Sequence, residues 1–321
     1  MTAHNDLHAL LFQATGAEYA VLCMQTYQLA RHALLNRLAA KTFRQPAVIF
    51  DLDETVLDNS AYQAWLIKEG RNFDEKTTWR AWCQAGESEA VPGAVEFVRF
   101  VEAAGVKPIF ITSREEVTRQ ATAKNLTRLS VLAPEDLDVE TVETKDVLPR
   151  HPFETRLFMK GMSDVSVPHP SGPQIYQLGN KFYQRVFCEQ VRGFEIILSV
   201  GDQLADYAEY YGGVNDATGK PVSGQFPTVA YRRLSALQDM SLFGRDFVLM
   251  PNATYGGWLR AFESNKLGAG DELAQTGEPV RQALVEPLGP FCIDEHNCFT
   301  AVGPKLSEKN LRVWKGPSGQ E

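Results

Sequence analysis

The chain lacks the features that would place it in several large classes of protein. It has no apolar run long enough to span a bilayer and no dense block of basic residues. With 32 Lys and Arg against 40 Asp and Glu, its net charge of −8 argues against nucleic acid as a partner. Its five cysteines are few and odd in number, so they do not form a disulfide framework. The remaining composition, with 44% hydrophobic residues, is that of a soluble globular protein.

The N-terminal residues show no export signal. The sequence Met1-Thr-Ala-His-Asn-Asp lacks a basic start followed by an apolar core. We therefore expect a cytoplasmic protein, or an exported one if the sequence starts at a mature terminus.

An acidic cluster directly follows a short apolar run. Residues 47–50 (Ala-Val-Ile-Phe) predict a strand buried on both faces, and Asp51-Leu-Asp53-Glu-Thr55 comes next. In a parallel α/β sheet, ligands bind at the edge where the strands end. Two carboxylates there repel each other unless a cation or a shared proton relieves them. The cluster therefore indicates a divalent metal site, with one carboxylate as nucleophile and the other as acid/base. The simpler alternative is an acidic turn.

Polar residues also follow two later apolar runs. Residues 107–111 lead into Thr112 and Ser113, and residues 194–200 lead into Gly201, Asp202 and, four residues on, Asp206. Because strands alternate with predicted helices, we expect an α/β fold with a doubly wound, mainly parallel sheet. The three strand ends would then gather these side chains at one edge.

The rest of the chain divides into recognisable parts. Residues 1–262 form one predicted domain, with an N-terminal helical part over 5–41 and small, helical, Trp-rich cap elements around 61–92. Residues 163–173 contain three prolines and predict a loop. Residues 263–321 predict an irregular C-terminal extension.

Taken together, the motifs resemble the class C acid phosphatases of the haloacid dehalogenase superfamily, a group that includes bacterial lipoprotein acid phosphatases with 5′-nucleotidase activity. The resemblance runs in order from about residue 7 to 262 and does not cover the tail. Its motifs lie at residues 51–60, 90–97, 110–115, 200–206 and 249–258.

The resemblance implies roles for the strand-end carboxylates. Asp51 would attack phosphorus, and Asp53 would protonate the leaving oxygen and then activate water. Mg²⁺ would be bound by the side chains of Asp51 and Asp202 and by the backbone carbonyl of Asp53. Asp206 would orient a metal-bound water.

The resemblance also implies phosphate-binding residues. Thr112 and the backbone N–H at Ser113 would hold phosphate oxygens. Lys181, followed by Arg185, is the preferred phosphate-binding lysine because it would open the helix before the last motif. Lys160 is the alternative. The remaining predicted substrate contacts are Arg114, Trp65 and Tyr255, with core packing as the competing interpretation for the Trp residues, including Trp79 and Trp82.

The leading functional hypothesis is therefore a Mg²⁺-dependent acid phosphatase for small phosphomonoesters such as 5′-nucleotides. Two alternatives stay open: a catalytically silent storage or binding protein on the same fold, and a phosphotransferase to an acceptor other than water. A homodimer is implied only by the family resemblance.

Overall fold

A five-stranded parallel sheet forms the centre of the molecule. The computed structural model describes residues 7–131, 133, 154–212, 227–265 and 314–316. Within these residues the strand order is β5-β4-β1-β8-β9, and every neighbouring pair is parallel. The predicted α/β fold with a mainly parallel sheet is confirmed. The strands are β1 (Pro46–Phe50), β4 (Lys107–Glu115), β5 (Leu157–Lys160), β8 (Glu195–Gly201) and β9 (Phe247–Leu249).

Strand β1 occupies the middle of this sheet because its side chains are apolar on both faces. Val48, Ile49 and Phe50 are all buried, as expected for a strand covered by helices on both sides. Ile49 pairs with Ile109 of β4 on one side and with Ser199 of β8 on the other. Asp51 therefore emerges between the ends of two neighbouring strands.

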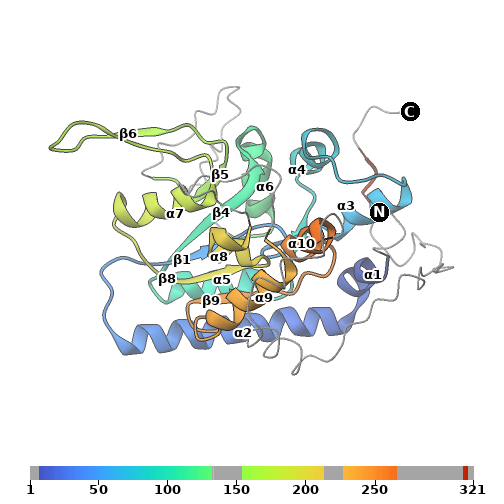
Figure 1. Cartoon of the computed structure of the whole chain (residues 1–321), viewed down its shortest axis with the longest axis horizontal. Coiled ribbons are helices and arrows are strands. Elements are labelled where there is room, and N and C mark those ends of the chain that lie inside the picture. Colours follow the sequence, from blue (N-terminus) through green and yellow to red (C-terminus); the bar gives the residue numbers. More distant parts are fainter. Residues whose placement is uncertain (1–6, 132, 134–153, 213–226, 266–313, 317–321) are drawn as a thin grey trace.

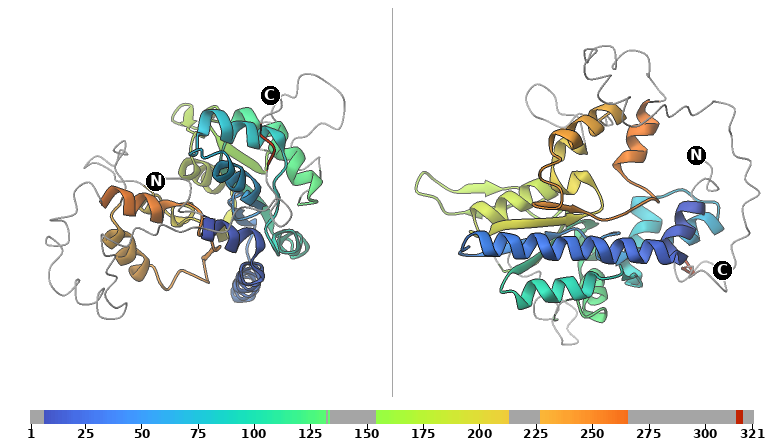
Figure 2. Two further views of the ribbon diagram at one scale, coloured as in Figure 1. Left: turned by 90° about the vertical axis from the view of Figure 1, so that its right-hand side faces the viewer. Right: turned by 90° about the horizontal axis from the view of Figure 1, so that it is seen from below.

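Helices cover both faces of the sheet. The long helix α2 (Ala17–Ala40) packs on β8, β9 and α5 (Ala94–Ala103), and Figure 1 shows it below the strands. Helix α7 (Lys181–Gln190) packs on β4 and β5 and lies above β1 and β8 in the same view. Seen from below, α2 runs along the sheet in front of the strands (Figure 2). The other elements of these layers are α1 (Leu7–Thr15), η2 (Glu116–Thr118), α6 (Arg119–Arg128), α8 (Leu204–Tyr207), η4 (Glu209–Tyr211), α9 (Val229–Gln238) and α10 (Gly257–Asn265).

A small cap lies between β1 and α5 in the sequence. Its strands β2 (Leu57–Asp58) and β3 (Glu89–Ala90) pair antiparallel. Between them lie α3 (Ser60–Lys68), the single π-helical turn η1 (Glu75–Trp79) and α4 (Arg80–Ala85). The predicted small, helical, aromatic-rich cap is therefore present.

The predicted loop at residues 163–173 was wrong in part. Strands β6 (Val165–Val167) and β7 (Gln174–Tyr176) pair antiparallel as a hairpin, which extends from the end of the molecule opposite α3 (Figure 1). The prolines between the two strands occupy the turn, where the ladder needs no backbone donor. Most of the predicted C-terminal extension lies outside the described residues. None of the described helices is both long and apolar enough to cross a membrane.

Candidate active site

Three carboxylates meet at the carboxyl end of the sheet. Asp51 follows β1, Asp202 follows β8, and Asp206 lies on the short helix α8. One oxygen of each lies within 4.8 Å of the others. Gly201 makes this approach possible, because a Cβ there would lie 2.7 Å from the Cβ of Asp206. Thr112, on the neighbouring strand β4, is buried at the same edge.

Lys181 neutralises part of this charge. Its Nζ donates to Asp51 Oδ1 at 2.5 Å and to Asp206 Oδ1 at 2.7 Å. The residue opens α7, whose first turn is capped by Asn180 through the backbone N–H of Tyr183. The structure therefore brings Lys181 to the carboxylates. Lys160 instead forms an ion pair with Glu75 of the cap.

Three carboxylates with one ammonium leave the cluster with excess negative charge. Burial raises the pKa of Asp51 well above its usual range, although Lys181 opposes this shift. Burial and the charge of Asp206 also raise the pKa of Asp202 to about 7, against the hydrogen bonds that its carboxylate accepts. A divalent cation would relieve this repulsion, and three carboxylates offer the oxygen ligands that Mg²⁺ prefers. The residues present therefore fit a Mg²⁺ site.

Asp53 lies apart from this cluster. Its Oδ1 accepts hydrogen bonds from Arg114 Nε at 2.9 Å and from Asn59 Nδ2 at 3.0 Å. The predicted metal contact of Asp53 was its backbone carbonyl, so a side chain directed elsewhere is compatible with that prediction. Thr112 Oγ1 accepts the backbone N–H of Arg114 at 3.1 Å, while Ser113 is exposed.

The other predicted substrate contacts have partners within the protein. Arg185 donates to the backbone carbonyls of Asp206 and Tyr207. The Tyr255 hydroxyl donates to the buried carboxylate of Glu54. The Arg114 side chain is fully buried. Their roles in substrate binding stay predictions.

Sequence reasoning missed two side chains that hold Asp202. Asn252 Nδ2 and Gln203 Nε2 each donate to Asp202 Oδ2 at 2.7 Å. Asn252 follows the last strand, β9, so the strand-end rule that found Asp51 could also have found it. Gln203 also accepts the backbone N–H of Gly257 at 2.7 Å, a contact with no local sequence signal.

Comparison with known proteins identifies a matching family model and similar solved structures. The family model for the HAD superfamily, subfamily IIIB (acid phosphatase), matches residues 5–148. Two solved structures of the class C acid phosphatase from Bacillus anthracis, one with tungstate bound, are 25% and 26% identical to this chain. Each superposes with a TM-score of 0.60, covering 88% of this chain and 97% of that one. These matches support the acid phosphatase family for this chain. As an acid phosphatase, it is a phosphomonoesterase.

In this acid phosphatase, aromatic side chains fill the interior of the cap. Trp65 is only 6% exposed, and its ring centre lies 5.1 Å from that of Trp314. Trp82 and Tyr62 belong to the same cluster. The backbone N–H of Trp314 donates to the carbonyl of Ala61 at 3.0 Å, so a residue of the C-terminal extension completes the cap core. Trp65 thus lies in a packed core, and its predicted stacking on substrate stays a prediction.

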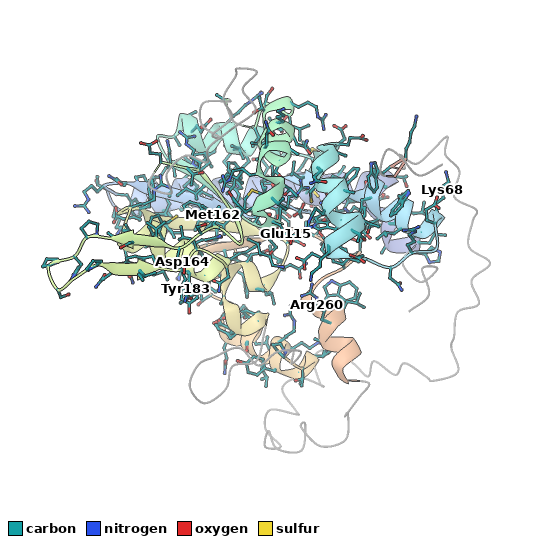
Figure 3. All side chains as sticks on the ribbon, turned by 90° about the horizontal axis from the view of Figure 1, so that it is seen from above. Lys68, Glu115, Met162, Asp164, Tyr183 and Arg260 are labelled. Carbon is teal, nitrogen blue, oxygen red and sulfur yellow. The ribbon has the colours of Figure 1, made fainter. Side chains whose placement is uncertain are left out.

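An ion pair joins the cap to the sheet. Arg80 of α4 donates from Nε and Nη2 to the two carboxylate oxygens of Glu115, at 2.8 and 3.0 Å. Glu115 ends β4 and lies beside the cap in Figure 3. The cap is therefore held to the strand that carries Thr112.

Proposed function

We propose that this phosphatase hydrolyses small phosphomonoesters, such as 5′-nucleotides, with Mg²⁺ and through an aspartyl-phosphate at Asp51. The observation that carries the proposal is the position of Asp51. Its carboxylate lies at the carboxyl end of the central strand, 2.5 Å from Lys181 and within the cluster formed with Asp202 and Asp206.

The metal site is supported by the chemistry of its ligands. Asp51, Asp202 and Asp206 would hold Mg²⁺, together with the backbone carbonyl of Asp53. When bound, the cation neutralises charge on the phosphate and screens it from the attacking carboxylate. Lys181 would serve the same purpose from the protein side, because its ammonium already contacts the nucleophile.

The described side chains can account for both chemical steps. In the first, an oxygen of Asp51 bonds to phosphorus as the P–O ester bond breaks, and the proton of Asp53 moves to the leaving oxygen. In the second, Asp53 takes a proton from water as that water bonds to phosphorus and the bond to Asp51 breaks. The site ends as it began, with phosphate and alcohol as products.

We expect this site to bind a tetrahedral anion. The Bacillus anthracis enzyme has been solved with tungstate bound, and tungstate has the shape of phosphate. In this chain the Thr112 hydroxyl, the exposed Ser113 and Lys181 are the groups that we expect to contact such an anion.

A phosphate-release panel tests the proposal. The substrates are 5′-nucleotides, nicotinamide mononucleotide, sugar phosphates and an aryl phosphate, each with Mg²⁺ or with a chelator. We expect release that depends on Mg²⁺ and is abolished by Asp51→Asn but not by Asp164→Asn, which neutralises an exposed carboxylate of the hairpin region. Mass spectrometry of acid-quenched enzyme should find phosphate on the peptide containing Asp51. Equal rates for the parent and Asp51→Asn would exclude the mechanism.

A further inference from the structure

One oxygen of Asp53 accepts two hydrogen bonds and makes a third, ion-pair contact. Arg114 reaches Oδ1 with Nε at 2.9 Å and Nη2 at 2.8 Å, and Asn59 Nδ2 reaches it at 3.0 Å. Among the described residues, no side chain or backbone group donates to Oδ2 of Asp53. The arrangement therefore fixes the orientation of the carboxyl group and leaves one oxygen to carry a transferable proton.

The Arg114 guanidinium is buried beneath the cap. Its side chain is 0% exposed, and Nη2 also contacts Asn59 Oδ1 and Ser88 Oγ, both at 3.1 Å. The guanidinium carbon lies 5.6 Å from the ring centre of Trp79. A buried guanidinium is unfavourable unless its donors are paired. The partners of Nε and Nη2 all lie within the protein, whereas Nη1 is buried without a hydrogen-bond partner among the described residues. This environment differs from that of an arginine that binds substrate from a surface cleft.

Side chains of the cap orient Asn59, which in turn contacts Asp53. Asn59 Oδ1 accepts from Trp82 Nε1 at 2.8 Å and from Ser88 Oγ at 2.9 Å. Asn59 is thus oriented by the cap, and its amide in turn contacts Asp53. The planar fork of arginine suits such a site, because it can bind Asp53 and the cap at the same time.

We propose that Arg114, with Asn59, is a positioning residue that holds Asp53 for proton transfer to the leaving group. The inference rests on the proposed role of Asp53 as general acid. It replaces the predicted substrate contact of Arg114 with an indirect role, in which Arg114 and Asn59 bind Oδ1 while Oδ2 delivers its proton to the leaving oxygen.

The dependence of the rate on the leaving group distinguishes a residue that positions Asp53 from one that contacts the substrate. An alkoxide needs a proton as the ester bond breaks, whereas a nitrophenolate leaves without one. Because kcat/KM reports the steps up to loss of the leaving group, we compare it for glycerol phosphate and for p-nitrophenyl phosphate. General acid catalysis is worth about 10²–10⁴-fold. We expect Arg114→Gln to lower kcat/KM by about 10²-fold or more for the alkyl ester and by less than about 10-fold for the aryl ester.

Matched variants complete the experiment. Like Arg114→Gln, Asp53→Asn should lower kcat/KM much more for the alkyl ester than for the aryl ester. Arg114→Lys should have a higher kcat/KM for the alkyl ester than Arg114→Gln. Arg80→Gln, which removes another arginine of this region that does not contact Asp53, should show no contrast. Inhibition by inorganic phosphate should be unchanged in Arg114→Gln, because the anion site is left intact.

Other results would overturn either the inference about Arg114 or the proposed role of Asp53. An equal loss on both esters, with weaker inhibition by phosphate, would make Arg114 a substrate contact and overturn the inference. If Asp53→Asn loses more kcat/KM on the alkyl ester than on the aryl ester but Arg114→Gln does not, the inference about Arg114 alone is overturned. If Asp53→Asn loses the same on both esters, the proposed role of Asp53 as general acid is overturned. If circular dichroism shows that Arg114→Gln does not fold, Ser88→Ala decides. In Ser88→Ala, a loss of kcat/KM that is at least about 5-fold larger for the alkyl ester than for the aryl ester would support the inference. This value is smaller than the full effect of general acid catalysis because Ser88 contacts Arg114 and not Asp53. Equal losses on the two esters would overturn the inference.

Discussion

Replacing Asp202 by Asn should stabilise the metal-free enzyme while abolishing its activity. Asp202 is 8% exposed and lies beside Asp206, and these two causes raise its pKa from 3.8 to about 7. Asparagine keeps an oxygen that can accept the hydrogen bonds from Asn252 and Gln203. The substitution therefore removes a buried charge with little change in shape.

The direction in which stability changes with pH follows from the protons bound to Asp202 in the folded and unfolded states. Between pH 4 and 7 the folded protein holds a proton on Asp202 that the unfolded chain has lost, so stability falls as pH rises through this range. The rise in the pKa of Asp202 from 3.8 to about 7 corresponds to roughly 4 kcal/mol. Since the repulsion is shared with Asp206, we expect Asp202→Asn to recover about 2–4 kcal/mol above pH 7. At ~2–4 °C per kcal/mol, Tm should rise by about 5–15 °C.

Thermal unfolding in a chelator at pH 8 and pH 5 measures this effect. The rise in Tm should be largest at pH 8 and smaller at pH 5, where Asp202 of the folded parent is already protonated. Mg²⁺ should raise the Tm of the parent but not that of Asp202→Asn, since a ligand that binds only the folded state stabilises it. Asp164→Asn should leave Tm unchanged at both pH values. An unchanged or lower Tm for Asp202→Asn at pH 8 would refute the electrostatic reasoning.

Three further variants test other parts of the site. Lys181→Gln should lower kcat by about 10²-fold or more through loss of charge stabilisation, whereas Lys160→Gln should change it less than about 2-fold; similar effects of the two would contradict the assignment. Gly201→Ala should displace the carboxylate of Asp206 and remove both activity and the Mg²⁺-dependent rise in Tm, with the far-ultraviolet spectrum retained. Trp314→Ala should lower stability by about 3–5 kcal/mol in denaturant titrations, as for other buried tryptophans; an unchanged midpoint would show that Trp314 does not stabilise the cap.

Features with a local sequence signal could be predicted. The strands were visible because short apolar runs with β-branched residues are typical of buried parallel strands. The residues Asp51, Thr112 and Asp202 were visible because each stands at or directly after such a run. Their proximity follows from parallel pairing, which places the ends of neighbouring strands at one edge.

Features that depend on distant contacts could not be predicted. Nothing near Arg114 in the sequence shows that Ser88 and Asn59 would surround it, so an arginine after a strand was interpreted as a substrate contact. The hairpin at residues 165–176 was hidden because its strands have only three residues each. Trp314 carries no periodic pattern of its own, and its place is set entirely by the aromatic cluster that it joins.

The position of Trp314 has a consequence for the order in which the protein is assembled. Cap residues Tyr62, Trp65 and Trp82 are synthesised early, but Trp314 is synthesised almost a whole chain later. Domains fold as units during synthesis, with N-terminal parts first, and long-range contacts form slowly because a long loop must close. We therefore expect the nascent protein to carry an unfinished cap with exposed aromatic surface, which offers a binding site to chaperones until Trp314 arrives.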